Sequence, residues 1–154
     1  MSDTRSVDLR GLKCPTPIVR LNEEIRNMVD DEELMSYISF TLPGIQRGPH
    51  EHVDQADLFC FIGPSTFNIR LWDNRPDSPT FNHMMSLDVG DENPMAVVVP
   101  KGVVHGYKNI GRIDGMVINC PNRLYMGDGK REPIDEIRHE DDPDTIYRME
   151  DSKL

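Results

Sequence analysis

Three histidines in two short motifs are the residues of this sequence best suited to chemistry. His50 and His52 stand two positions apart, and His105 follows Pro100 and Gly102 further along the chain. Residues two apart on a strand face the same side, so His50 and His52 can share one pocket. Imidazole titrates near neutral pH and is also a common metal ligand. The pattern therefore predicts a pocket that serves either acid–base chemistry or metal binding.

The metal interpretation has a defined set of candidate ligands. The set is His50, His52 and His105, with Asp57 as a possible carboxylate ligand. Imidazoles combined with a carboxylate suit divalent transition metals such as Fe, Mn, Ni, Cu or Zn. The two other histidines, His83 and His139, are expected to be solvent-exposed.

Composition and charge limit the classes of function. The chain has 154 residues, a formal net charge of −10, and 11 glycines and 12 prolines. We expect one domain rich in turns, no nucleic-acid partner and, without an apolar run of about 20 residues, no membrane span. The polar N-terminus and three widely spaced cysteines indicate a cytoplasmic protein with reduced thiols.

The elements that must position the histidines are mostly short strands. Strands are predicted at seven places. Short strands at this spacing, separated by turns, favour a double-sheet jelly roll. The predicted strands span 36–42, 57–62, 66–72, 82–88, 95–99, 104–108 and 114–119. The segment Gly63–Ser65 is interpreted as a hairpin-type turn.

Both ends of the chain differ from this strand-rich middle. Thr16 and Pro17 predict a helix start, and apolar residues at helical spacing follow. We therefore expect an N-terminal strand–helix arm over 1–35, a barrel over 36–127, and an acidic tail over 128–154 that packs on the barrel.

The second motif resembles a known fold family. Pro100, Gly102, His105 and Asn109 match the second cupin motif position by position, and His50-x-His52 followed by Asp57 matches part of the first. The resemblance implies an all-β cupin, a double-stranded β-helix or jelly roll, with the short N-terminal strand–helix arm added to it.

Three longer segments make the resemblance narrower. The segments 43–50, 75–81 and 100–107 are similar to the dTDP-4-dehydrorhamnose 3,5-epimerase family and its sugar-epimerase-like relatives. That similarity covers roughly 36–147. It implies a homodimer without a cofactor that acts on a nucleotide-linked 4-keto sugar by proton transfer next to the ketone.

The resemblance also assigns roles to residues. The catalytic base falls on His50, and a second pocket histidine falls on His105. The carboxylate that orients the base falls on Asp142, with Asp141 and Asp144 as close alternatives. Arg47 matches the family arginine beside the base. Because a pocket in a protein of net charge −10 must supply its own cations, Arg47, Arg75 and Lys101 are the candidates for contact with the diphosphate, and Tyr107 is a further candidate substrate contact.

Two positions depart from the family pattern. Asp57 stands where the family has a lysine, and Ile118 stands where it has the tyrosine that acts as general acid. Tyr125 is a candidate substitute for that tyrosine. These departures leave two alternatives open: a metal-binding cupin and a non-catalytic sugar-binding cupin.

A separate match lies in the arm. Residues 8–19, which contain Cys14-Pro-Thr-Pro17, resemble the Cys-Pro-x-Pro signature of small sulfur-carrier proteins. A cysteine at a helix N-terminus favours the thiolate form. Because 35 residues are fewer than such a domain needs, we expect the segment to be an arm that packs on the barrel or on a partner subunit.

Overall fold

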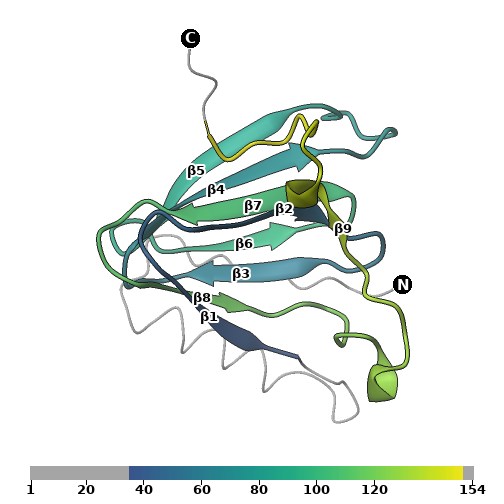
Figure 1. Cartoon of the computed structure of the whole chain (residues 1–154), viewed down its shortest axis with the longest axis horizontal. Coiled ribbons are helices and arrows are strands. Elements are labelled where there is room, and N and C mark those ends of the chain that lie inside the picture. The colour runs from purple at the N-terminus through teal and green to yellow at the C-terminus, as the bar shows by residue number, and fades with distance from the viewer. Residues whose placement is uncertain (1–34, 151–154) are drawn as a thin grey trace.

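A computed structural model describes residues 35–150, and these form an almost entirely β structure (Figure 1). The predicted helix over residues 16–28 and Cys14 lie outside the described residues. The strands within this described range are β1 Tyr37–Thr41, β2 Gln46–Glu51, β3 Asp57–Phe61, β4 Thr66–Asp73, β5 Met84–Gly90, β6 Met95–Val99, β7 Val103–Asn109, β8 Gly115–Asn119 and β9 Ile137–Arg138. Two 3₁₀ turns, η1 Asp128–Lys130 and η2 His139–Asp141, interrupt the C-terminal segment.

The strands form two antiparallel sheets. The four-stranded sheet has the order β1-β8-β3-β6, and the five-stranded sheet has the order β5-β4-β7-β2-β9. Strands that follow one another in the chain therefore change sheet repeatedly, as in a jelly roll. This architecture confirms the predicted all-β fold class.

The hydrophobic core lies between the two sheets. Phe59 and Phe61 of β3 meet Phe67 and Ile69 of β4, and Tyr107 of β7 packs among the phenylalanine rings. Phe61 and Phe67 are fully buried. Burying a side chain of this size contributes about 2–3 kcal/mol. Phe59 and Tyr107 belong both to this core and to the lining of the cavity described below.

The segment Gly63–Ser65 is a turn, but the prediction of a hairpin was wrong. Its flanking strands β3 and β4 belong to different sheets. The segment therefore carries the chain from one layer to the other. Gly63 and Ser65 both have positive φ, at 90° and 75°, which fits a sharp change of direction.

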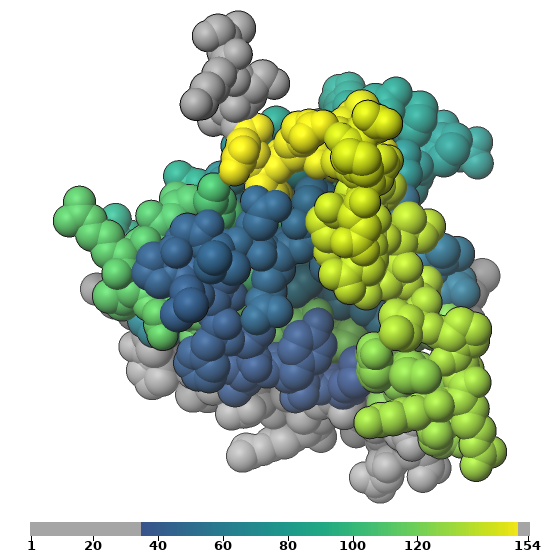
Figure 2. All heavy atoms as spheres, in the orientation of Figure 1, coloured from purple at the N-terminus to yellow at the C-terminus, as the bar shows by residue number. Residues whose placement is uncertain are grey.

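The C-terminal segment packs against the five-stranded sheet. Strand β9 pairs with β2, placing Arg138 opposite His50 and Ile137 opposite Glu51. Beyond η2, Tyr147 contacts Trp72 with ring centroids 5.7 Å apart, and Met149 is buried. In Figure 2 this segment, in yellow, lies over the blue atoms of the barrel. The segment thereby forms one wall of the barrel mouth.

Among residues 35–150, no helix has the length and apolar character that crossing a membrane would require.

Candidate functional site

A hollow opens at the end of the barrel that carries His50 and His52. It has a volume of about 900 Å³, and residues of both sheets and of the segment 123–140 line it. His50 and His52 lie on its wall, as do Tyr37, Arg47 and Tyr107. A cavity of this size matches the range typical of small-molecule sites.

A glycine allows the histidine-bearing strand to approach its neighbour closely. Strand β2 pairs with β7, with His50 opposite His105, and the register shifts between Arg47 and His50. Gly48 has a φ of 74°, and a Cβ at this position would lie 2.7 Å from the His105 carbonyl oxygen. Only glycine fits here without displacing β7, and this contact sets the position of His50.

The structure brings the three histidines together. The ring of His50 lies 4.5 Å from that of His105 and 5.3 Å from that of His52, centroid to centroid. Nitrogen atoms of all three rings lie within 4.8 Å of one another. His105 is 1% exposed and lies behind the other two, whereas His50 and His52 reach the cavity surface.

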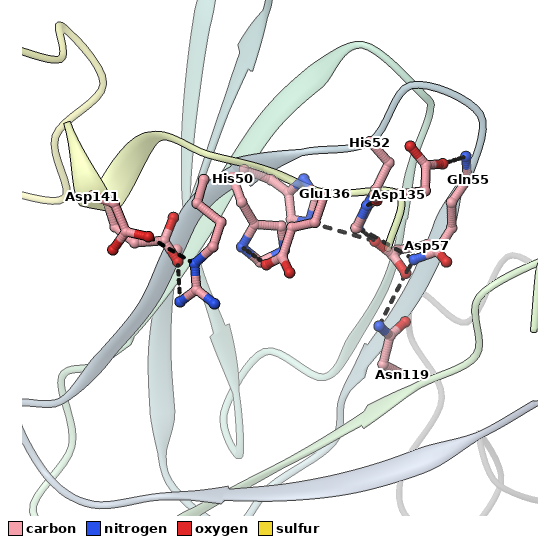
Figure 3. A network of polar contacts seen from close by, with 12 residues as sticks. His50, His52, Gln55, Asp57, Asn119, Asp135, Glu136 and Asp141 are labelled. Carbon is pink, nitrogen blue, oxygen red and sulfur yellow. Dashed lines mark hydrogen bonds and ion pairs between the residues drawn. The ribbon is translucent and has the colours of Figure 1, made fainter. Parts of the chain in front are cut away.

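A buried carboxylate lies beneath the histidines. The Asp57 Oδ2 atom is 3.0 Å from His52 Nε2 and 3.5 Å from His105 Nε2. Its Oδ1 atom accepts hydrogen bonds from Asn119 Nδ2 at 3.0 Å and from Gln55 Nε2 at 3.1 Å. Figure 3 shows this network. Burial raises the pKa of Asp57, but the adjacent His105 and His52 rings and the bond from Asn119 outweigh burial and hold that pKa well below its usual range.

Backbone carbonyls determine which nitrogen of each ring carries a proton. His105 Nδ1 donates to the Val103 carbonyl at 3.0 Å, and His52 Nδ1 donates to the Asp135 carbonyl. The neutral forms of both rings therefore direct an Nε2 lone pair at Asp57. A bond from His52 Nε2 to the carboxylate requires the imidazolium form. Burial lowers the pKa of His52, but the bonds to Asp57 and Asp135 raise it further, and the net shift is upward.

His50 has the opposite electrostatic character. Burial, with the neighbouring His105 and His52 rings, lowers its pKa to about 3. Its Nδ1 is buried and lies 3.7 Å from Glu136 Oε1, which is longer than a hydrogen bond. Glu140 lies in the same cluster. His50 is consequently neutral at pH 7, with a nitrogen lone pair available to accept a proton or bind a metal.

The carboxylates beside His50 are not the ones that the sequence suggested. Asp142 is exposed, and its side chain accepts a bond from the Asp144 backbone N–H. Asp141 pairs with Arg138. The acids next to His50 are Glu136 and Glu140, because β9 brings the residues around 137 alongside β2.

Two of the cations proposed for substrate binding are engaged elsewhere. The Arg75 guanidinium binds both oxygens of Asp73, at 2.7 and 2.8 Å, in the loop between β4 and β5. Lys101 is largely exposed and lies 3.8 Å from Asp54. Neither is among the described residues that line the cavity. The sequence shows the charge of these two residues, but it does not show the nearby carboxylate with which each of them forms an ion pair.

The other predicted contacts do line the cavity. Arg47 donates to the Thr41 hydroxyl and to the Phe40 carbonyl, both at 3.3 Å, so its partners carry no charge. The Tyr107 hydroxyl lies 3.1 Å from Ser39 Oγ. Tyr125 is about half exposed at the cavity rim.

Several residues of the site carried no signal in the sequence. Asp135 accepts three backbone N–H bonds, from Val53, Asp54 and Gln55, at 2.7–2.9 Å. These bonds fix the turn after His52 and the start of the C-terminal segment to each other. Glu136, Glu140, Asn119 and Tyr37 also belong to the site. None of them lies in a recognisable motif, since their places depend on strand pairing.

The donor set fits a transition metal in its chemistry. Three imidazoles with nitrogens within 4.8 Å of one another are a suitable first set of ligands. His50 Nδ1, His105 Nε2 and Asp57 Oδ2 are buried without a hydrogen bond in the described structure. Such atoms are rare in proteins unless an ion or water satisfies them. His50, His52 and His105, with Asp57, would hold the ion, which would act as a Lewis acid.

Sequence comparison finds two similar proteins whose names refer to polysaccharide or glycan biosynthesis. The chain is 36% identical over 110 residues to "Probable low-salt glycan biosynthesis epimerase Agl13" of Haloferax volcanii, covering 68% of this chain and 69% of that protein. It is 33% identical over 115 residues to "Spore coat polysaccharide biosynthesis protein SpsL" of Bacillus subtilis, covering 70% and 76%. No model of a protein family matches the sequence.

Structural comparison supports the fold. A dTDP-4-dehydrorhamnose 3,5-epimerase from Bacillus anthracis, solved with TDP and PPi bound, superposes with a TM-score of 0.55 and 22% identity, over 68% of this chain and 61% of that one. The capsular polysaccharide assembling protein CapF from Staphylococcus aureus gives a TM-score of 0.55 at 20% identity, and 69% of this chain matches only 27% of CapF. Together with the 36% identical relative, this fold shows that the chain belongs to the dTDP-4-dehydrorhamnose 3,5-epimerase-like family of cupin sugar epimerases.

Proposed function

We propose that the protein epimerises a nucleotide-linked 4-keto sugar by removing a proton next to the ketone, with His50 as the base. The observation that carries the proposal is a neutral imidazole on the wall of a cavity of about 900 Å³. The family supports the reaction class, and the TDP bound to the Bacillus anthracis relative supports the kind of substrate.

The proton abstraction assigns separate roles to the two nitrogens of His50. Its Nδ1 faces Glu136, so its Nε2 is the atom that would accept the proton from the sugar carbon. The imidazolium that forms would be stabilised by the Glu136 and Glu140 carboxylates. A positioned base of this kind contributes about 10²–10⁴-fold to the rate.

The anionic part of the substrate needs a cation on the cavity wall. Arg123 pairs with Asp54 and Glu132, and Arg138 pairs with Glu140 and Asp141. Arg47 bonds only to neutral groups in the described structure, so its charge is available. We assign Arg47 to the diphosphate or to the enolate oxygen, because the family lysine is replaced by Asp57, which already pairs with His52.

Deuterium exchange tests the base. The protein is incubated with dTDP-4-keto-6-deoxyglucose in D₂O, and deuterium at C3 and C5 is measured by NMR. We expect His50→Gln to slow exchange at least about 100-fold. His83→Gln, at an exposed residue outside the cavity, is the matched control and should exchange at the wild-type rate. Wild-type protein that exchanges no deuterium into this or related 4-keto sugars would refute the proposal.

A metal-binding role is the second candidate. His50 and His105 each have a buried ring nitrogen without a hydrogen bond, and the histidine cluster places ring nitrogens within 4.8 Å of one another, which favours this role. Elemental analysis of untagged protein, with the His52→Ala variant beside it, separates the two candidates. A stoichiometric transition metal that His52→Ala loses would favour the metal site. Metal-free protein whose melting temperature rises when a dTDP-sugar is added would favour the epimerase.

A further inference from the structure

Epimerisation requires a proton donor as well as a base. The base removes a proton from one face of the sugar carbon, and the donor returns one to the other face. The family tyrosine for this role is replaced by Ile118. On β8 the buried positions are Gly115, Val117 and Asn119, so Ile118 faces away from the barrel interior. The donor must therefore come from another position.

Tyr37 lines the cavity from the sheet that does not carry His50. It belongs to β1 of the four-stranded sheet, whereas His50 belongs to β2 of the five-stranded sheet. Both residues line the same cavity. Tyr37 pairs with Asn119 across β1 and β8, next to the position that the family tyrosine occupies. A sugar ring between the two sheets would present opposite faces to the two side chains.

Hydrogen bonding orients the Tyr37 hydroxyl. The ionised Asp57 carboxylate can only accept, so the Asn119 amide must turn its NH₂ group towards it. The same Nδ2 atom lies 2.7 Å from the Tyr37 oxygen and donates to it. Tyr37 is thus the acceptor of that bond, and its own proton remains free to be donated. Within residues 35–150 the structure gives that proton no acceptor.

We propose that Tyr37 is the proton donor that completes the epimerisation. The proposal rests on the function proposed above. His50 Nε2 takes the proton as the C–H bond breaks, and the electron pair moves into the enolate. The enolate carbon then forms a new C–H bond with the Tyr37 proton on its opposite face, leaving a phenolate. Water returns a proton to the phenolate and takes one from His50, which restores both groups.

Two other tyrosines of the cavity are weaker candidates. Tyr107 lies on β7, in the same sheet as His50, and its hydroxyl is engaged with Ser39. Tyr125 lies in the loop after β8, and no described side chain orients its hydroxyl. Tyr37 is as exposed as Tyr125, at about half of its surface, but its hydroxyl is held by Asn119. Partial burial raises the pKa of Tyr37 and the bond from Asn119 offsets this only in part, so the hydroxyl is protonated at neutral pH.

The test separates proton exchange from inversion. Tyr37→Phe and Tyr125→Phe proteins are incubated with dTDP-4-keto-6-deoxyglucose in D₂O, and deuterium wash-in and the inverted product are measured together by NMR. With Tyr37→Phe we expect exchange within about threefold of wild type and inversion slowed at least about 100-fold. Tyr125→Phe, at the alternative donor on the cavity rim, should invert far faster than Tyr37→Phe. Tyr147→Phe, at a tyrosine outside the cavity that packs on Trp72, is the control and should leave both rates unchanged. Thermal unfolding of each variant verifies that it is folded.

Three results obtained with the variants would overturn the Tyr37 assignment alone. The first is inversion by Tyr37→Phe at the wild-type rate, and the second is loss of inversion in Tyr125→Phe. The third is an equal loss of exchange and inversion in Tyr37→Phe, which would indicate a role in substrate binding. Wild-type protein without exchange would refute the His50 mechanism and the Tyr37 assignment together. If Tyr37→Phe is the variant that exchanges deuterium but does not invert the sugar, the result would support both His50 as the base and Tyr37 as the donor.

Discussion

Replacing Asp57 with asparagine tests the electrostatic account of the histidine cluster. The substitution keeps the shape of the side chain but removes the negative charge of a residue that is only 2% exposed. In the native protein this carboxylate lies 3.0 Å from His52 Nε2, with which it forms an ion pair when His52 is protonated, and it accepts bonds from Asn119 and Gln55. Asparagine can retain the last two bonds through its oxygen, but it cannot neutralise the imidazolium.

The expected loss of stability is about 3 kcal/mol, the lower end of the cost of removing one partner from a buried ion pair. The loss should depend on pH. The pKa of His52 is raised, so the pair stabilises the protein fully below about pH 6.5 and loses this contribution as pH rises through the raised pKa. The pKa of Asp57 is lowered, so the contribution is present above about pH 4 and declines as pH falls towards the lowered value.

Urea unfolding of wild type and Asp57→Asn at pH 5.5 and pH 9 measures both effects. The difference in unfolding free energy should be near the full value at pH 5.5 and smaller at pH 9. Asp88→Asn is the control, because Asp88 is an exposed acid that also accepts an asparagine amide bond, and its change should stay within about 0.5 kcal/mol. A loss below about 1 kcal/mol at pH 5.5, or one that increases towards pH 9, would refute the buried ion pair.

Four further outcomes are expected. Gly115→Ala places a Cβ 2.3 Å from Phe67 Cζ and should reduce the unfolding free energy by about 1–3 kcal/mol, measured in urea. Asp135→Ala removes three accepted N–H bonds and should cost about 2 kcal/mol in the same assay, whereas a neutral result would mean that water replaces them. Burial raises the pKa of the Cys60 thiol to about 12, so peptide mapping should find it unmodified by iodoacetamide at pH 8. The pKa of His50 is about 3, so His50 should not titrate near pH 6.5. Any change of kcat/KM for exchange with pH around 6.5 should therefore also be present in the pH profile of His50→Gln.

The strands were accessible from the sequence because their signals are local. Apolar runs such as Leu58–Ile62 and the turn residues between them mark β3 to β8 within a few residues. The sheet to which each strand belongs was not accessible. The hairpin expected at Gly63–Ser65 shows why, since a turn signal does not specify whether the next strand pairs with its predecessor or crosses to the opposite layer.

The candidate site divides in the same way. His50, His52, His105 and Asp57 follow from motif spacing, and the structure places them together. The acids at 136 and 140 do not follow from it, because β9 has only two residues and no hydrophobic pattern. Its register on β2, not the similarity of the Asp142 region to a family motif, determines which carboxylates approach His50.

The carbonyls of Val103 and Asp135 have a consequence for how the protein can evolve. They fix the tautomers of His105 and His52, yet every amino acid supplies the same carbonyl. Substitutions at positions 103 and 135 that preserve the backbone path therefore leave the tautomers of the neutral His105 and His52 rings unchanged. The protein can vary these side chains freely with respect to tautomer, while a shift of the backbone by about 1 Å would break the hydrogen bonds on which the tautomers depend.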